Sequence, residues 1–158
     1  MSTTNTVFFS LGSNQGDRKF LLQKAIELLN ERAGDIRAVS SFYETEPWGF
    51  DSPFPFLNAA LCLQTSIEPK SLLQITQQIE KELCRIRKPE QTGYTDRTID
   101  IDMLLYANII ISTPYLTLPH PLMTQRRFVL EPLCEIAPQL KHPCGKTISE
   151  LLSELPND

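Results

Sequence analysis

Four segments of the chain have the pattern of β-strands: one is a continuous run of β-prone residues, and three alternate apolar with polar residues. They span residues 7–11, 36–42, 57–63 and 99–105. Two other segments place apolar residues on one helical face, one after Asp17 and one after Pro69. Asp17 suits a helix N-cap and Pro69 suits a first helical turn. The predicted order is strand, helix, strand, strand, helix, strand.

This order is typical of the ferredoxin-like βαββαβ fold of the α+β class, an antiparallel sheet with both helices on one face. The residues after the last strand form a C-terminal extension. Residues 1–158 are expected to form a single domain, because this length is too short for two domains of typical size. We expect the face of the sheet without helices to be free to carry a site.

Prolines outnumber glycines, 12 to 6, and they are grouped. Two runs lie at 47–55 and 114–121, and a looser group comprises Pro132, Pro138 and Pro143. Because proline fixes φ and has no N–H to donate, all three groups predict ordered loops or edges rather than helix or central strand.

Charge and composition narrow the class of protein. The net charge of −4 disfavours tracking of a nucleic-acid backbone, and no apolar run approaches the ~20 residues of a membrane span. The N-terminus lacks the pattern of a signal peptide. The four cysteines form no closely spaced pair, which favours reduced thiols: Cys62, Cys84, Cys134 and Cys144. We therefore expect a cytoplasmic monomer with neither nucleic acid nor membrane as partner.

The last predicted strand carries two acidic residues at alternate positions. Its apolar residues, which we expect to face the core, are Ile99, Ile101, Met103 and Leu105. Asp100 and Asp102 then project together from the other face, ~6.5–7 Å apart along the chain. Two carboxylates this close repel each other unless a cation intervenes, and Mg²⁺ prefers such oxygens together with those of phosphates. Taken alone, however, such a pair is more often the solvated side of a strand.

Basic residues near the pair favour the metal interpretation. They are Arg85, Arg87, Lys88 and Arg97 before the strand and Arg126 and Arg127 after it. Each alone is most simply a surface charge, but guanidinium groups match phosphate oxygens, and phosphoryl transfer depends on charge stabilisation and positioning. Together they indicate a site for a metal–triphosphate complex. His120, between two prolines, is a candidate phosphate donor, whereas His142 has no partner visible in the sequence.

Aromatic residues gather between the second and third predicted strands. Trp48, Phe50, Phe54 and Phe56 are interleaved with proline and glycine, and they fit either a flap of the core or a stacking surface. Asn58 alternates with core-facing neighbours, so it faces the same side as the acidic pair. An amide matches the lactam-like edge of a heterocycle, and aromatic rings supply stacking planes. This arrangement indicates a slot for a flat ring with a polar edge.

The glycine-containing segment 12–16 follows a strand and precedes a helix, but it lacks the lysine and the spacing of a P-loop. We interpret it as a structural turn. Two other classes of protein remain open. A nucleotidyl-transferring palm domain also has outward Asp residues but needs a basic track for its template. A non-enzymatic ligand- or RNA-binding module has no use for paired carboxylates among arginines.

Several short motifs occur in a specific order along nearly the whole chain. They are LGSN at 11–14, SFYET at 41–45, FLNAA at 56–60, RTIDID at 97–102, PHP at 119–121, RRFVL at 126–130 and EIAP at 135–138. In this order they resemble the 6-hydroxymethyl-7,8-dihydropterin pyrophosphokinase family of the folate pathway. The resemblance implies a ferredoxin-like fold and transfer of diphosphate from ATP to the pterin hydroxymethyl oxygen, with release of AMP.

The resemblance also implies roles for individual residues. Asp100 and Asp102 would bind two Mg²⁺ ions, and Arg85 and Arg97 would reach the phosphates as further catalytic residues. The pterin slot would comprise Thr45, Glu46, Trp48, Phe56, Asn58 and Phe128, with the ring stacked between Phe128 and an aromatic residue of the first proline loop. The ATP-binding residues would be Gln77, Glu80, Arg87, Lys88, Arg97, Met103, Thr117, His120 and Arg126.

The chain departs from the common family pattern at a few positions. Tyr94 stands where many members have tryptophan, and the segment 87–97 is about two residues longer. Glu46 and Trp48 stand where smaller apolar residues are common.

Overall fold

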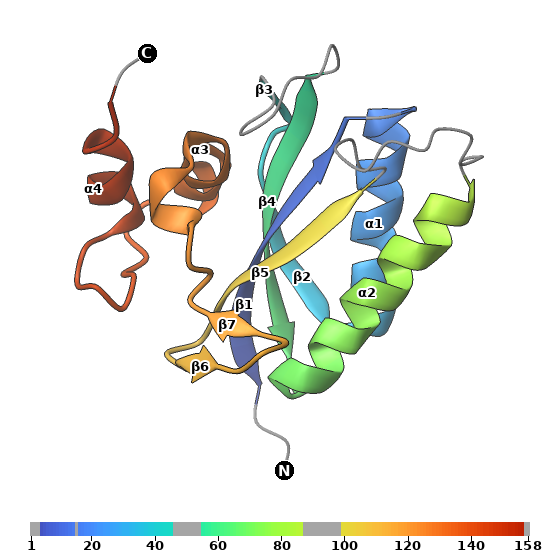
Figure 1. Ribbon diagram of the computed structural model, residues 1–158, viewed down its shortest axis with the longest axis horizontal. Coiled ribbons are helices and arrows are strands. Elements are labelled where there is room, and N and C mark those ends of the chain that lie inside the picture. The colour runs from blue at the N-terminus through green and yellow to red at the C-terminus, as the bar shows by residue number, and fades with distance from the viewer. Residues whose placement is uncertain (1–3, 15, 46–54, 87–98, 157–158) are drawn as a thin grey trace.

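The computed structural model describes residues 4–14, 16–45, 55–86 and 99–156, and Figure 1 shows their arrangement. The elements of the main sheet and its helices are β1 (Asn5–Ser13), α1 (Arg18–Arg32), β2 (Asp35–Val39), β3 (Tyr43–Thr45), β4 (Phe56–Thr65), α2 (Pro69–Ile86) and β5 (Asp100–Tyr106). The C-terminal elements are β6 (Ile111–Ser112), β7 (Thr117–Leu118), a 3-10 turn (Met123–Gln125), α3 (Arg127–Ile136) and α4 (Ile148–Ser153).

The strands form an antiparallel sheet in the order β2-β4-β1-β5, and β3 pairs with the opposite end of β4. The predicted order of strands and helices is confirmed, except that the predicted second strand is divided into β2 and β3. Ser40 explains the division. Its backbone N–H donates to the Ala60 carbonyl (2.8 Å), and its hydroxyl accepts from the Ala60 N–H (2.9 Å), so a side chain replaces a backbone partner at this point.

The two predicted helices, α1 and α2, pack side by side on one face of the sheet (Figure 1). Asp17 caps α1 as expected, because its carboxylate accepts from the Phe20 N–H at 3.1 Å. Apolar side chains of both helices and of the facing strands are buried together: Val7, Phe9, Leu11, Leu22, Leu29, Leu61, Leu63, Leu72, Ile79, Leu83, Ile101 and Met103. This first core confirms the helical and strand periods read from the sequence.

The second face of the sheet is not free, contrary to the expectation. Helices α3 and α4 cover part of it, so the sheet lies between two helical layers (Figure 1). The apolar residues of this second core are Phe8, Ala60, Leu104, Leu105, Met123, Val129, Leu130, Leu133, Ile148 and Leu151. The prediction of a free second face was wrong because α3 and α4 follow the last strand of the βαββαβ unit. The order of elements in that unit does not determine where a C-terminal extension packs.

A β-bulge in β5 corrects the predicted orientation of Leu105. Phe8 pairs with Leu105 and Phe9 pairs with Met103, which leaves Leu104 as an extra residue opposite β1. Met103 therefore faces α1 and α2, whereas both Leu104 and Leu105 contribute to the second core. A strict two-residue period places Leu105 beside Met103, and the bulge breaks that period.

Pro132 corrects a second expectation, because it lies inside α3 rather than in a loop. Without an N–H it cannot donate to the carbonyl four residues earlier, a loss that costs about 3 kcal/mol or more inside a helix. The helix buries Val129, Leu130, Pro132 and Leu133. Burial of each large apolar side chain contributes about 1.5–3 kcal/mol, so packing on the sheet outweighs the missing hydrogen bond.

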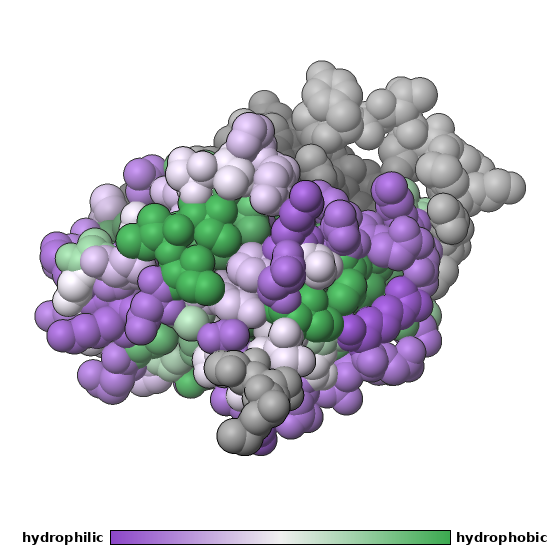
Figure 2. Space-filling model, turned by 90° about the horizontal axis from the view of Figure 1, so that it is seen from below, coloured by the Kyte–Doolittle hydropathy of each residue, from purple (hydrophilic) through white to green (hydrophobic). Residues whose placement is uncertain are grey.

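The short β6 and β7 strands lie at the lower end of the molecule in Figure 1, and Figure 2 views the molecule from that end, where apolar side chains are exposed among polar ones. The segment around them exposes Ile109, Ile110 and Tyr115. The Lys70 ammonium of α2 lies 5.5 Å from the centre of the Tyr115 ring. This confirms the expected edge or loop structure for the prolines at 114–121.

Within the described ranges, no helix combines the length and apolar character that crossing a bilayer requires. All four cysteines are described, and each is a free thiol, as their spacing predicted.

Candidate active site

A polar patch lies on the second face of the sheet, beside the apolar residues that pack against α3 and α4. It comprises Ser10, Gly12, Asn58, Asp100 and Asp102. The register produces it: Gly12 lies directly between Asn58 of β4 and Asp100 of β5, and Ser10 lies opposite Asp102. Residues opposite each other in an antiparallel pair project from the same face. The prediction that Asn58 and the acidic pair share a face is confirmed.

Gly12 places no side chain in the middle of the patch. A Cβ at this position would lie 3.0 Å from the Asn58 Oδ1 and 3.7 Å from the Phe56 ring. Any side chain would therefore displace the amide on one side of the patch. The absence of a side chain leaves room between the Asn58 amide and the Asp100 carboxylate.

Asn58 is buried, with 2% of its surface exposed, and its amide is oriented by a neighbour. Its Nδ2 donates to the Thr45 hydroxyl at 2.5 Å. Thr45 in turn pairs with Phe56 at the start of β4. Three residues predicted to line the pterin slot, Thr45, Phe56 and Asn58, thus lie together at one end of the sheet.

Asp100 and Asp102 are half-buried on β5, which is an edge strand of the described sheet. The Glu80 carboxylate of α2 accepts a hydrogen bond from the Ile101 N–H at 2.8 Å. This bond satisfies an edge amide that lies between the two acidic residues, so α2 holds the backbone that carries them. Glu80 was predicted among the ATP-binding residues, and this contact gives it a structural role as well.

The donor set of the acidic pair fits a hard cation. Carboxylate oxygens are the ligands that Mg²⁺ prefers, and this ion usually keeps waters and phosphate oxygens in its remaining positions. Among the described residues, no group of three or more His, Cys, Asp or Glu side chains is arranged to hold a metal ion. Two carboxylates alone suit a metal that arrives with a phosphate ligand better than one enclosed by protein.

His120 lies next to β5, because its backbone N–H donates to the Leu104 carbonyl at 2.9 Å. Its Nδ1 accepts from the Leu122 N–H at 3.3 Å, which leaves Nε2 as the protonated nitrogen of the neutral ring. Burial, followed by the positive charge of Arg126, lowers the pKa of His120 below its usual value. At neutral pH the imidazole is therefore uncharged and has a single N–H to donate.

Arg126 and Phe128 flank the start of α3. The Arg126 guanidinium carbon lies 5.5 Å from the centre of the Phe128 ring, a cation–π arrangement. A residue predicted to bind ATP and one predicted to stack on the pterin are thus in direct contact.

The remaining described candidates are more dispersed. Met103 is 5% exposed within the first core, so its backbone is the part of this residue able to reach a ligand. Gln77 is exposed on α2, and Thr117 is exposed on β7. The other candidates lie outside the described residues: Glu46, Trp48, Arg87, Lys88, Arg97 and the side chain of Arg85.

The structure adds two residues to which the sequence assigned no role. The Arg18 guanidinium donates to the Pro55 carbonyl (2.9 Å) and to the Glu44 carboxylate (2.7 Å), so it joins the two sides of the segment 46–54. Glu135 of α3 accepts hydrogen bonds from Ser41 and Tyr43. Glu135 and Tyr43 lie 92 residues apart, so no local sequence pattern predicts their contact. The only signal for either residue was its place in one of the family motifs.

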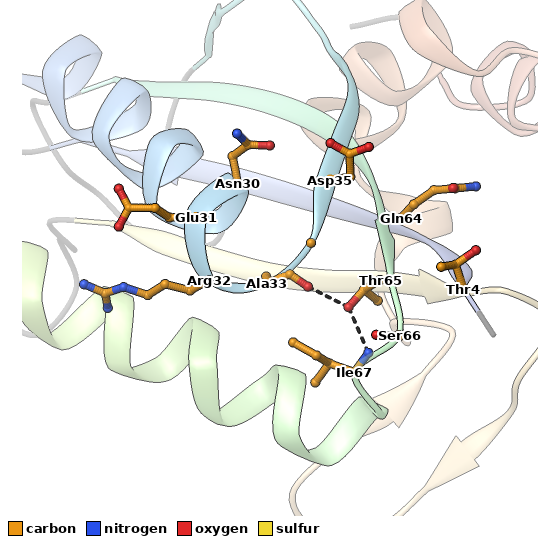
Figure 3. Close-up of a pocket in the computed structure, with 11 residues that line it drawn as sticks. Thr4, Asn30, Glu31, Arg32, Ala33, Asp35, Gln64, Thr65, Ser66 and Ile67 are labelled. Atoms are coloured by element: carbon orange, nitrogen blue, oxygen red, sulfur yellow. Dashed lines mark hydrogen bonds between the residues drawn. The ribbon is translucent and has the colours of Figure 1, made fainter. Parts of the chain in front are cut away.

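A pocket of about 400 Å³ lies at the opposite end of the sheet, where α1 ends and β4 leads into α2 (Figure 3). The Thr65 hydroxyl there donates to the Ala33 carbonyl (2.6 Å) and accepts from the Ile67 N–H (3.0 Å). A Cβ on Gly34 would lie 2.2 Å from the Gln64 carbonyl oxygen, so this position requires glycine. These contacts pack the end of α1 closely against the end of β4. The pocket is therefore part of a structural contact between these two elements, and it lies far from the polar patch.

A sheet between two helical layers, with a largely buried polar patch at one end, defines an α+β protein whose candidate site lies on the second face of the sheet. The chain belongs to the 7,8-dihydro-6-hydroxymethylpterin-pyrophosphokinase family, whose model matches residues 8–138. This confirms the resemblance drawn from the motifs.

Relatives of similar length share much of the sequence. A 2-amino-4-hydroxy-6-hydroxymethyldihydropteridine pyrophosphokinase of Porphyromonas gingivalis (strain ATCC 33277) is 52% identical over 142 residues, which cover 89% of this chain and 96% of that protein. The protein of the same name from Bacillus subtilis (strain 168) is 44% identical over 138 residues, 87% of this chain and 81% of that protein.

Solved structures support the fold. The crystal structure of wild-type HPPK-DHPS from Plasmodium falciparum matches with a TM-score of 0.79 at 17% identity, over 98% of this chain. This chain spans 45% of that longer chain. At this identity the likeness concerns the fold alone, and it agrees with the antiparallel α+β architecture predicted from the sequence.

Proposed function

We propose that this chain transfers diphosphate from ATP to the hydroxymethyl group of 6-hydroxymethyl-7,8-dihydropterin, a step of tetrahydrofolate biosynthesis that yields the pterin diphosphate and AMP. Family membership and the names of relatives of matching length support this activity. The structural observation that carries it is the register around Gly12, which places a buried amide and a carboxylate on either side of a residue that has no side chain.

The pterin slot comprises Thr45, Glu46, Trp48, Phe56, Asn58 and Phe128. The contact of Asn58 with Thr45 supports this assignment, because a fixed amide offers a donor and an acceptor in a defined direction to the polar edge of the ring. Stacking on the Phe128 ring complements that edge-on recognition.

The triphosphate site comprises Asp100 and Asp102 with two Mg²⁺ ions, and it includes Gln77, Glu80, Arg85, Arg87, Lys88, Arg97, Met103, Thr117, His120 and Arg126. When bound, Mg²⁺ neutralises phosphate charge and brings the two substrates into line. The bond from Glu80 to the Ile101 N–H supports the assignment, because it fixes the strand segment between the two carboxylates. Neutral His120 donates its Nε2–H to a phosphate oxygen.

In the proposed step the hydroxymethyl oxygen bonds to the β-phosphorus, and the bond from that phosphorus to the oxygen bridging the α-phosphate breaks. AMP leaves with the bridging oxygen. An Asp100 or Asp102 carboxylate oxygen is the candidate acceptor of the hydroxyl proton. The arginines and Lys88 stabilise the charge on AMP and on the transferred group. We further propose that the chain acts as a single-domain monomer in the cytoplasm.

The decisive experiment measures the nucleotide released from ATP. AMP should appear only when both Mg²⁺ and the hydroxymethyl-dihydropterin are present, and mass spectrometry should detect the pterin diphosphate in equal amount. Release of ADP or of pyrophosphate would instead indicate an ordinary kinase or a nucleotidyltransferase.

Asp100→Asn and Asp102→Asn test the metal assignment. Each should lower AMP release by several orders of magnitude and leave the folded state largely intact, because both side chains are only half-buried and belong to neither apolar core. Circular dichroism of the same samples checks folding. A folded variant with near-normal turnover would contradict the assignment.

A further inference from the structure

Strand β3 depends on contacts from outside the sheet for its position. It has three residues, and within the described sheet it pairs with β4 alone, through Tyr43 with Asn58, Glu44 with Leu57 and Thr45 with Phe56. A pairing this short fixes a strand weakly. Thr45, which orients the buried Asn58 amide, is the last residue of this strand.

Helix α3 supplies a strong contact to this strand through one carboxylate. Glu135 accepts from the Ser41 N–H (3.0 and 3.1 Å to its two oxygens), from the Ser41 hydroxyl (3.1 Å) and from the Tyr43 hydroxyl (2.5 Å). We name Glu135, Ser41 and Tyr43 the β3 clamp. Hydrogen bonds to an ionised group are stronger than neutral ones. The bonds lower the pKa of Glu135 and raise the pKa of Tyr43 to about 12, as strong donation to a carboxylate requires.

The opposite side of β3 is also held. Glu44, between Tyr43 and Thr45, projects from the other face of the strand and bonds to Arg18 at the start of α1. Strand β3 is thus joined to α3 on one face and to α1 on the other. Its position is set by two charged contacts in addition to the ladder.

The β3 clamp connects two walls of the proposed pterin slot. Phe128 lies seven residues before Glu135 in α3, so both side chains lie on the same side of the helix, two turns apart. Helix α3 packs against β4 and β3. The helix that carries the stacking ring is therefore bonded to the strand that carries Thr45, the partner of Asn58.

We propose that Glu135 is a positioning residue for the pterin: its carboxylate holds β3 against α3 and so fixes the Thr45–Asn58 pair relative to Phe128. This inference rests on the pterin slot proposed above. When the clamp is lost, β3 keeps only its short ladder to β4 and the Glu44–Arg18 bond, so Thr45 and the Asn58 amide that bonds to it are less firmly fixed. The acidic pair lies on β5, which is separated from β3 by β1 and β4, and α2 holds its backbone through the bond from the Ile101 N–H to Glu80, so we expect nucleotide binding to be unaffected.

Glu135→Gln tests the proposal, because glutamine keeps the shape but has one neutral acceptor oxygen for three donors. Titration calorimetry would measure the affinity for the pterin and, in a separate titration, the affinity for a non-hydrolysable ATP analogue with Mg²⁺. We expect pterin affinity to fall about tenfold, with the affinity for the analogue within about twofold of wild type. Tyr43→Phe removes one donor and keeps the ring, so its loss of pterin affinity should be smaller, about three- to fivefold.

Glu154→Gln is a matched control, because it removes one exposed carboxylate in an ion pair with Lys146, at the end of the neighbouring helix α4. It should change neither affinity. Equal weakening of both ligands by Glu135→Gln, or no change in either, would overturn the proposal. If Glu135→Gln fails to fold, Tyr43→Phe decides: selective loss of pterin affinity supports the clamp, and wild-type affinity refutes it.

Asn58→Ala separates this inference from the proposed function. If Asn58→Ala binds the pterin normally, the slot itself is wrong, and the role of the clamp with it. If Asn58→Ala loses pterin affinity while both clamp variants retain it, the slot stands and only the positioning role of Glu135 is wrong.

Discussion

Replacement of Gly12 by alanine is a sensitive test of the polar patch, because the structure gives the contact that the new methyl group makes. The added Cβ would lie 3.0 Å from the Asn58 Oδ1, whereas ordinary contacts lie at 3.4–4 Å. The amide must therefore move by a few tenths of an ångström. Its hydrogen bond to the Thr45 hydroxyl, now 2.5 Å, changes with it.

Two effects on stability partly cancel in this variant. Overpacking a filled site costs typically about 1–3 kcal/mol, whereas replacing glycine by alanine restricts the unfolded chain and contributes about 0.4–1 kcal/mol of stability. The net loss of unfolding free energy is then between roughly 0 and 2.6 kcal/mol. Pterin binding should also weaken, because a misdirected amide leaves polar groups on the edge of the pterin without hydrogen-bond partners. At about 1–3 kcal/mol, this corresponds to about 5- to 150-fold weaker pterin binding.

Calorimetric titration of Gly12→Ala with the pterin and with a non-hydrolysable ATP analogue, together with urea unfolding, measures these quantities. Gly34→Ala is the contrasting variant, because its Cβ would meet the Gln64 carbonyl oxygen at the remote end of the sheet. It should lower stability without a selective effect on the pterin. Wild-type pterin affinity in folded Gly12→Ala would refute the role assigned to Gly12.

Two further predictions concern the C-terminal extension. Leu133→Ala empties a fully buried position of the second core, so urea unfolding should show a loss of about 2–5 kcal/mol, and a loss below 1 kcal/mol would contradict the packing of α3 on the sheet. The bonds from Tyr43 and then Ser41 lower the pKa of Glu135 below its ordinary 4.5. These bonds therefore stabilise the folded state fully above pH 4.5, and their contribution is lost as the pH falls through the lower pKa of the folded state. The difference in urea stability between wild type and Glu135→Gln should thus be seen at pH 7 and shrink at pH 3, and a constant difference would argue against the clamp.

The parts of the fold that follow from local periodicity could be predicted from the sequence. Asp17 and Pro69 mark the starts of α1 and α2 because capping and the first-turn geometry depend on neighbouring residues alone. Alternation also placed Asn58 and the acidic pair on one face, because side chains in a strand alternate by geometry. The bulge at Leu104 and the helical position of Pro132 escaped prediction, since each local irregularity is compensated by packing against a distant element.

The candidate site divides in the same way. Thr45, Phe56 and Asn58 lie close in sequence across one connection, so strand pairing predicted their proximity. Glu135 and Tyr43 meet only because α3 folds back over the sheet, and no period in either segment encodes that contact. The motifs that contain them indicated importance without indicating a partner.

The bond between Glu80 and the Ile101 N–H has a consequence for how members of this family can differ. It joins α2 to β5 across the connection 87–98, so both attachment points of that connection are fixed independently of its length. We therefore expect insertions or deletions there, such as the additional residues inferred from the family pattern, to leave Asp100 and Asp102 in place. Evolution can therefore alter the length of this connection without moving the strand that carries the two carboxylates.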